Sequence, residues 1–378
     1  MIYLDNNSTT PVDTRVLDTM LPFYTESFAN PSSTHRFGNN INKEVNSARK
    51  QVADFINADE SEIIFTSGAT EAINLAIKGV AEYYSFKGKH IITASTEHKA
   101  VLNTCKDLER KGFEITYLPV QKNGLINLNE LDEAIRSDTI LVSIMYVNNE
   151  TGVVQPIKEI ASIVHKYDCL FMSDATQAAG KIDVDVNGLN VDLLCFSGHK
   201  MYAPKGIGAL FIKQRNIKVK IIPQISGGNQ EKGLRSGTLN VPGIIALAKA
   251  CEIASLEMKT MQSKILALRD RLEAEMLKLS NTFVNGDTVN RLYNTTNICF
   301  KGQDATILIG QMKDIAVSNS SACTSAVVEP SHVLVAMGLN SDDAFASLRF
   351  SLGKYNTLDE IEKVTRKLKE LTQQNNYA

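Results

Sequence analysis

Three short stretches of the chain place chemically useful residues directly after a predicted strand. Residues 67–70 (SGAT) lie between an apolar run and a helical pattern, so the free N–H groups at the helix start could bind a phosphate. Asp174 ends a second apolar run, and Lys200 follows His199 just after a third. A buried lysine has a lowered pKa, and its neutral amine can form a Schiff base.

Each stretch also has a plain structural interpretation. Ser67 or Thr70 could be a side-chain N-cap, and Asp174 could cap a helix as well. Lys200 could lie in a surface loop. The three stretches together favour a different interpretation, because they supply what pyridoxal 5′-phosphate needs. The phosphate needs N–H and hydroxyl donors, the pyridine nitrogen needs a carboxylate, and the aldehyde needs an amine.

The elements that must position these residues follow a βα rhythm. Helical periodicity covers 38–58, with Ile41, Val45 and Val52 on one face, and recurs after 71 and over 157–167. Runs that predict strands lie at 63–66, 90–95, 115–118, 140–147, 170–174, 193–197 and 208–212. Most are apolar throughout, which is typical of strands covered on both faces. The pattern predicts an α/β fold with a mostly parallel central sheet.

The pattern changes after Pro242. A long helix is predicted over 242–279, with proline in its first turn. Strands at 296–300 and 347–351 then alternate with helices at 305–312 and 358–373, as in a smaller α+β domain. We expect 16–255 to form the large domain. Residues 1–15 and 256–378 would form the small one.

Composition excludes several classes of protein. The chain has 378 residues, is 43% hydrophobic and 22% charged, and has a net charge of −2. A nucleic-acid binder normally carries a basic stripe. No apolar run reaches the ~20 residues that span a bilayer, and the N-terminus does not resemble a secretion signal. We therefore expect a cytoplasmic protein without nucleic-acid or membrane partners.

Further motifs resemble those of a known family. The three stretches resemble the fold-type-I pyridoxal-phosphate enzymes, and almost the whole chain resembles the cysteine desulfurases of the iron–sulfur-cluster and nitrogen-fixation type, in the class V aminotransferase branch. The motifs are 3–11 (YLDNNSTTP), 96–101 (TEHKAV), 147–152 (VNNETG), 235–238 (RSGT), 321–325 (SACTS) and 349–351 (RFS).

The resemblance implies a role for each site residue. Lys200 would hold the cofactor as an internal aldimine and then act as the base at Cα. Asp174 would pair with the pyridine N–H and Gln177 would bind the phenolic oxygen. His98 would be a catalytic residue that stacks on the ring and could shuttle protons. The phosphate would be held by Ala69, Thr70, Ser197, His199 and, from the neighbouring subunit of a homodimer, Thr238. The substrate L-cysteine would be held by Asn149 and Arg349, whose planar fork suits a carboxylate.

The six cysteines are scattered, with no CxxC pair that would indicate a zinc ribbon. Cys323 alone lies in a small, polar segment (about 318–330) typical of a loop, and the other five lie in or beside helix and strand patterns. By the resemblance, Cys323 attacks the substrate's sulfur, becomes a persulfide and passes sulfur to an acceptor or iron–sulfur scaffold protein. We expect no structural metal. Cys323 would at most contact a cluster on the scaffold.

Three departures from the family pattern stand out. The chain ends soon after the helix at 358–373, which puts one scaffold-docking mode in doubt. Asn229 replaces a common glycine, and Ser8 replaces a common alanine, without a clear consequence. A selenocysteine lyase, another pyridoxal-phosphate lyase or aminotransferase, and a non-catalytic sulfur-relay protein stay open as alternatives.

Overall fold

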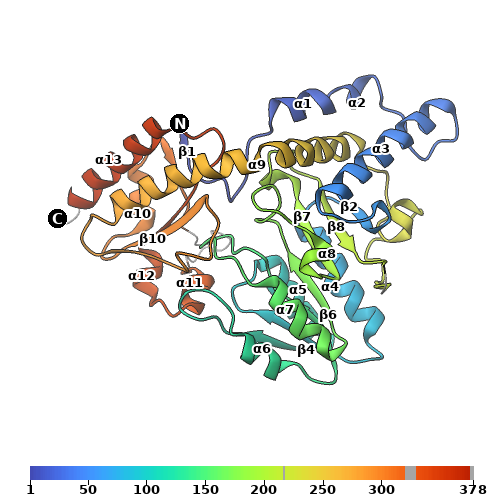
Figure 1. Cartoon of the computed structure of the whole chain (residues 1–378), viewed down its shortest axis with the longest axis horizontal. Coiled ribbons are helices and arrows are strands. Elements are labelled where there is room, and N and C mark those ends of the chain that lie inside the picture. Colours follow the sequence, from blue (N-terminus) through green and yellow to red (C-terminus); the bar gives the residue numbers. More distant parts are fainter. Residues whose placement is uncertain (216–217, 320–328, 375–378) are drawn as a thin grey trace.

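A computed structural model describes residues 1–215, 218–319 and 329–374 (Figure 1). Its largest sheet has seven strands in the order β2-β8-β7-β6-β5-β3-β4. These strands are β2 (Ile63–Thr66), β3 (His90–Ala94), β4 (Glu114–Leu118), β5 (Thr139–Ser143), β6 (Leu170–Asp174), β7 (Leu193–Ser197) and β8 (Gly208–Ile212). The pairs from β7 to β4 are parallel, and β8 runs antiparallel to both of its neighbours, β2 and β7. This confirms the predicted α/β fold with a mostly parallel sheet.

Helices cover both faces of this sheet. On β6, Phe171 packs in a cluster with α3 (Arg36–Phe55), α7 (Ile157–Val164) and the first half of α9 (Val241–Met276). The next residue, Met172, packs in a separate cluster with α4 (Ala69–Tyr84) and α5 (Lys99–Glu109). Successive side chains of a strand point to opposite faces of the sheet. Both faces are therefore apolar, and the strands show no alternation of apolar and polar residues.

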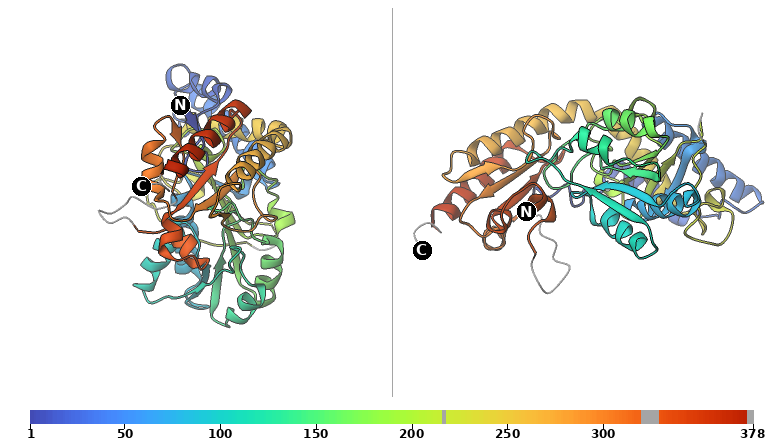
Figure 2. Two further views of the ribbon diagram at one scale, coloured as in Figure 1. Left: turned by 90° about the vertical axis from the view of Figure 1, so that its left-hand side faces the viewer. Right: turned by 90° about the horizontal axis from the view of Figure 1, so that it is seen from below.

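The long helix α9 joins the two parts of the molecule (Figures 1 and 2). Its 36 residues give a length of about 54 Å. Asn240 caps the helix start by accepting from the Gly243 N–H, and Pro242 lies in the first turn. The first half packs on the large sheet, and the second half, including Leu268 and Leu272, packs in a cluster with the C-terminal elements.

The second part is built around a three-stranded antiparallel sheet in the order β12-β10-β9. The two ends of the chain meet here, because Leu4 packs in the same cluster as the C-terminal helix α13 (Leu358–Gln374). The N-terminal strand β1 (Ile2–Tyr3) pairs in parallel with β11 (Ile315–Ala316). The other elements are β9 (Thr282–Val284), β10 (Thr295–Phe300), β12 (Ser347–Ser351), α10 (Ala305–Gln311), α11 (His332–Ala336) and α12 (Ser341–Phe345).

Shorter elements complete the described chain. The remaining helices are α1 (Thr14–Met20), α2 (Pro22–Thr25), α6 (Leu128–Ala134) and α8 (Val186–Leu189), and the 3-10 turns are η1 (Glu60–Glu62), η2 (His165–Tyr167), η3 (Gly198–Lys200) and η4 (Gln230–Gly233). Within the described ranges, no helix is long and apolar enough to cross a membrane.

One predicted strand is too long. The apolar run 140–147 predicts a strand to Val147, but β5 ends at Ser143. Ile144, Met145 and Val147 are nevertheless buried. Val147 pairs instead in an antiparallel bridge with Val154. The apolar run thus indicated burial and not strand structure after Ser143, where the chain enters the loop that carries Asn149.

Candidate active site

The carboxyl ends of the parallel strands converge on a cavity of about 620 Å³, which we call the strand-end cavity. A cavity of this size can enclose a cofactor-sized ligand. Open α/β sheets bind ligands at this edge. Within the described ranges, all the predicted site residues except Thr238 line it: Ala69, Thr70, His98, Asn149, Asp174, Gln177, Ser197, His199, Lys200 and Arg349.

The start of α4 forms one wall of this cavity. Its N-cap residue is Gly68, whose φ of 153° suits glycine and which gives no side-chain cap. The alternative of a side-chain N-cap from Ser67 or Thr70 is therefore wrong, and the first N–H groups of the helix lack a side-chain cap. Ser197 and His199 line the same cavity. This set of donors fits a phosphate.

A carboxylate near this helix start is neutralised by an arginine. Glu71 lies in the first turn of α4 and accepts from the Ser67 N–H at 2.9 Å. Arg235 donates from Nε to Glu71 Oε1 at 2.8 Å, and these contacts lower the pKa of Glu71 against its desolvation. Arg235 belongs to the same segment as Thr238, which is exposed and does not line the cavity of its own chain.

Asp174 presents one oxygen to the protein. Its Oδ1 accepts from the Thr176 N–H at 2.9 Å and from Cys195 Sγ at 3.7 Å. Among the described residues no donor binds Oδ2. Asp174 ends β6 and is followed by turns rather than a helix, so it does not cap a helix. A free carboxylate oxygen in the cavity fits a protonated pyridine nitrogen.

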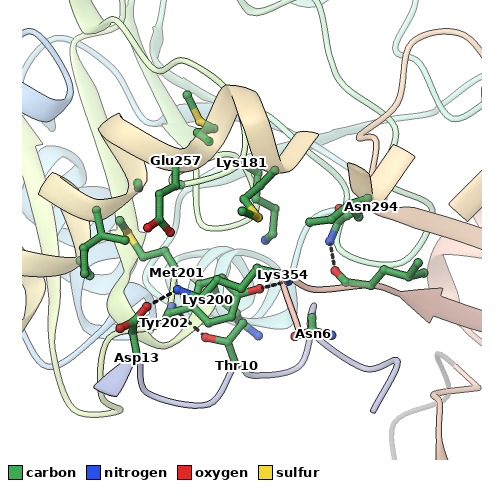
Figure 3. Close-up of a pocket in the computed structure, with 18 of the residues that line it drawn as sticks. Asn6, Thr10, Asp13, Lys181, Lys200, Met201, Tyr202, Glu257, Asn294 and Lys354 are labelled. Carbon is green, nitrogen blue, oxygen red and sulfur yellow. Dashed lines mark hydrogen bonds and ion pairs between the residues drawn. The ribbon is translucent and has the colours of Figure 1, made fainter. Parts of the chain in front are cut away.

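Lys200 ends the η3 turn after β7 and lies between two cavities. Its Nζ donates to the Asn7 carbonyl at 2.6 Å and to the Ser8 carbonyl at 2.5 Å. Burial, followed by the charge of Arg349, lowers the pKa of Lys200 to about 8. Lys200 also lines a smaller cavity, which we call the rear cavity, beside the ion pair of Asp13 with Lys354 (Figure 3).

The two histidines of the site are placed differently. His98 is exposed and caps α5 by accepting from the Ala100 N–H at Nδ1. His199 contacts Thr9 Oγ1 at 3.1 Å, and burial lowers its pKa to about 4. His199 is therefore neutral at pH 7 and can offer one N–H donor to a ligand rather than a positive charge.

Arg349 comes from β12 of the second sheet and is 5% exposed. It donates to the Asn149 carbonyl at 2.9 Å, to Asp5 Oδ1 at 2.6 Å and to Ser8 Oγ at 2.8 Å. Ser8 therefore does have a consequence that the sequence did not reveal, because its hydroxyl accepts from the guanidinium. The N-terminal segment and the second sheet together bring this cation to the large sheet.

Sequence reasoning missed two buried ionisable groups. Glu97 is fully buried, and burial raises its pKa well above the usual value. One of its oxygens accepts from the Met145 N–H, and the other has no partner among the described residues. Lys181 is 6% exposed and donates to Gln177 Oε1. Glu97 lies within the motif 96–101 and Lys181 follows Gln177 by four residues, but nothing in either stretch marks its burial.

Five cysteines are buried, as predicted: Cys105, Cys169, Cys195, Cys251 and Cys299. Burial raises the pKa of each of them. A nucleophilic thiol must be accessible and ionised, so these five are poor candidates. The described ranges contain no cluster of three or more His, Cys, Asp or Glu residues suited to a metal.

Cys323 lies outside the described residues, but the two flanks of its segment are described. Ser318 and Glu329 both line a cavity of about 240 Å³, which we call the adjoining cavity. This cavity shares Ser8, His98, Asn149 and Arg349 with the strand-end cavity. Ser318 also pairs with Arg349 through the backbone. The segment that carries Cys323 therefore leaves and re-enters the described structure beside the site.

The donor set fits pyridoxal 5′-phosphate. An uncapped helix start with nearby hydroxyls suits the phosphate, the free oxygen of Asp174 suits the pyridine nitrogen, and Lys200 has a lowered pKa that suits attack on the aldehyde. Each group comes from a different strand end of one sheet. Because three separate requirements of the cofactor are met together, the site indicates pyridoxal 5′-phosphate more specifically than any one of the three stretches does.

Comparisons with known proteins agree with this fit. The family model Aminotransferase class-V matches residues 2–364. Cysteine desulfurase IscS of Colwellia psychrerythraea is 50% identical and that of Pectobacterium carotovorum 51% identical, each over 96% of this chain and 90% of the relative. A solved NifS-like protein has a TM-score of 0.92 and 40% identity, covering 98% of this chain and 99% of its own.

A second solved structure, SspA in complex with cysteine, has a TM-score of 0.83 and 39% identity, covering 94% of this chain and all of its own. Enzymes of this family depend on pyridoxal phosphate. The match over nearly the whole chain, in sequence and in fold, shows that the chain belongs to the cysteine desulfurase family of class-V aminotransferases.

Proposed function

We propose that this pyridoxal-phosphate enzyme is a cysteine desulfurase, which takes sulfur from L-cysteine, releases L-alanine and carries the sulfur on Cys323. The observation that carries the proposal is the adjoining cavity. It shares Arg349, His98 and Asn149 with the strand-end cavity, and both flanks of the Cys323 segment line it. A transaminase has no use for a nucleophilic cysteine.

The cofactor would be held in the strand-end cavity. Ala69, through its N–H, and Thr70, Ser197 and His199 would bind the phosphate, and Thr238 would bind it from a partner subunit. Asp174 would hold a proton on the pyridine nitrogen, Gln177 would donate to the phenolic oxygen, and His98 would stack on the ring. When bound, pyridoxal phosphate supplies an electron sink for the pair released at the substrate's Cα.

Lys200 would have two tasks. It would hold the cofactor covalently and, once the substrate displaces it, accept the Cα proton at Nζ. A pKa of about 8 suits a base that works near neutral pH. Arg349 and Asn149 would orient the substrate, with the guanidinium binding the carboxylate. Because Asp5 and Ser8 already accept from Arg349 Nη2, they hold the fork in place before the substrate arrives.

The Cys323 thiolate would then attack the substrate's sulfur. A sulfur–sulfur bond forms while the substrate's carbon–sulfur bond breaks, and the electron pair stays with carbon. That carbon takes a proton, alanine leaves, and Cys323 holds a persulfide. An acceptor or iron–sulfur scaffold protein would remove the outer sulfur.

Several further assignments belong to this proposal. The protein would be cytoplasmic. It would also be a homodimer, since Thr238, which the resemblance assigns to the phosphate, does not line the cavity of its own chain. Residues 16–255 would form the large domain, and residues 1–15 and 256–378 the small one. The separate hydrophobic clusters on either half of α9 support that division. Mixed disulfides trapped on Cys323 of the persulfide-loaded protein would identify the acceptor.

The experiment measures sulfide, with a thiol reductant present, and alanine from L-cysteine. Equal amounts of both, lost in Cys323→Ser and kept in the control Cys299→Ala, are expected. No sulfide from cysteine, with selenide released from selenocysteine, would replace the proposal by a selenocysteine lyase. A colourless protein that pyridoxal phosphate does not reconstitute would point instead to a non-catalytic sulfur-relay protein.

A further inference from the structure

A lysine lies buried directly behind the strand-end cavity. Lys181 lies at the end of the turn after β6, is 6% exposed and lines the rear cavity with Lys200 (Figure 3). Its Nζ donates to Gln177 Oε1 at 2.8 Å and to the Gln177 carbonyl at 3.3 Å. Within the described ranges, no carboxylate forms an ion pair with it. The hydrogen bonds of the Lys181 amine to described residues therefore both go to Gln177, which lines the strand-end cavity.

The neighbours of Gln177 determine which way its amide points. On one side, the Asn7 carbonyl can only accept, and Gln177 Nε2 donates to it at 2.9 Å. On the other side, Lys181 Nζ donates to Oε1. The two contacts demand the same orientation. They leave the second N–H of Nε2 for a ligand in the strand-end cavity, which Gln177 lines.

We propose that Lys181 is a positioning residue, which holds the Gln177 amide with its N–H toward the phenolic oxygen of the cofactor. The inference rests on the proposed binding of pyridoxal phosphate in the strand-end cavity. Donation to the phenolic oxygen stabilises negative charge there. The nitrogen that joins the cofactor to Lys200 then becomes less basic.

Keeping a lysine at this place has a cost in stability. Burial, and then the charges of Lys200 and Arg349, lower the pKa of Lys181 to about 7. An ammonium without a carboxylate partner is unfavourable in the interior, and an apolar replacement of similar size is often neutral or stabilising. A purely structural lysine would not be expected here. This supports a role toward Gln177 and the cofactor.

The test compares Lys181→Met with the wild-type holoenzyme. Methionine keeps the length of the side chain and removes both the donor and the charge. Lys181→Arg restores a donor, and Lys50→Met is the control, because Lys50 is exposed and forms a surface ion pair with Asp54. The readout is the visible band of the lysine-bound cofactor against pH, since the band changes when the linking nitrogen gains or loses a proton.

We expect Lys181→Met to raise the midpoint of this change by about one pH unit, which is a tenfold higher proton affinity. Lys181→Arg should return the midpoint most of the way toward wild type, and Lys50→Met should leave it unchanged. Thermal unfolding should find Lys181→Met at least as stable as wild type.

A midpoint in Lys181→Met equal to that of wild type would overturn the inference. So would a lower midpoint, or a large loss of thermal stability in both the cofactor-free and the loaded protein, which would mark Lys181 as structural. The band is measured without substrate. A failure of the proposed desulfurase activity therefore shows in wild type alone, whereas a failure of this inference shows only between the variants.

Discussion

The most direct consequence of the site's geometry concerns the Lys200 amine. In the cofactor-free protein, burial and Arg349 lower its pKa to about 8, whereas an exposed lysine has a pKa of 10.5. At pH 7, about 9% of an amine with a pKa of 8 is neutral, against about 0.03% for a pKa of 10.5. The fold therefore raises the reactive fraction about 300-fold.

The perturbation is a pH series on cofactor-free protein, and the assay is brief acylation followed by mass spectrometry of the labelled peptides. Because only the neutral amine reacts, labelling of Lys200 should rise tenfold per pH unit below pH 8 and level off above about pH 9. Lys50 is the internal reference. Its contact with Asp54 raises the pKa, so its labelling should still climb above pH 10. Labelling of Lys200 that rises in parallel with Lys50 would refute the reasoning.

Three further predictions concern single side chains. Lys200→Ala should abolish sulfide release but still bind the cofactor noncovalently. Denaturation and filtration should then remove all of the cofactor from this variant, and measurable turnover would contradict the assigned role. Asp174→Asn should keep the visible band and lower sulfide release at least ~100-fold, because a neutral partner no longer holds the pyridine proton; a loss below tenfold would argue against this pairing. Arg349→Lys should raise KM for cysteine about tenfold with a smaller change in kcat, because a lysine cannot form the planar two-point contact with a carboxylate. An unchanged KM would show that Arg349 does not bind the carboxylate of the substrate.

Much of the fold was predictable because hydrophobic pattern and secondary structure agree. The strands Leu170–Asp174, Leu193–Ser197 and Gly208–Ile212 have their predicted bounds, since each is an apolar run closed by polar or turn residues. The run 140–147 exceeded its strand because burial continues past Ser143. Pattern alone cannot separate a buried strand from a buried loop.

The site was predictable where its groups follow strand ends, since a parallel sheet brings its carboxyl ends to one edge. Asp174 and Lys200 are of this kind. The groups that were missed reach the site by other routes. Ser8 is brought there by pairing with the second sheet, and Glu97 and Lys181 are buried by packing that the sequence does not encode locally.

Local pattern was thus enough to predict the order of elements, the parallel sheet, and the amine, the carboxylate and the phosphate-binding groups along one edge. These depend on local pattern and on the direction of neighbouring strands. The tertiary structure decided which way those groups act. It left α4 without a side-chain cap, turned one oxygen of Asp174 toward the cavity and brought Arg349 across from the second sheet. It also lowered the pKa values of Lys200 and Lys181 by burial, because desolvation and long-range charge arise only once distant segments pack together.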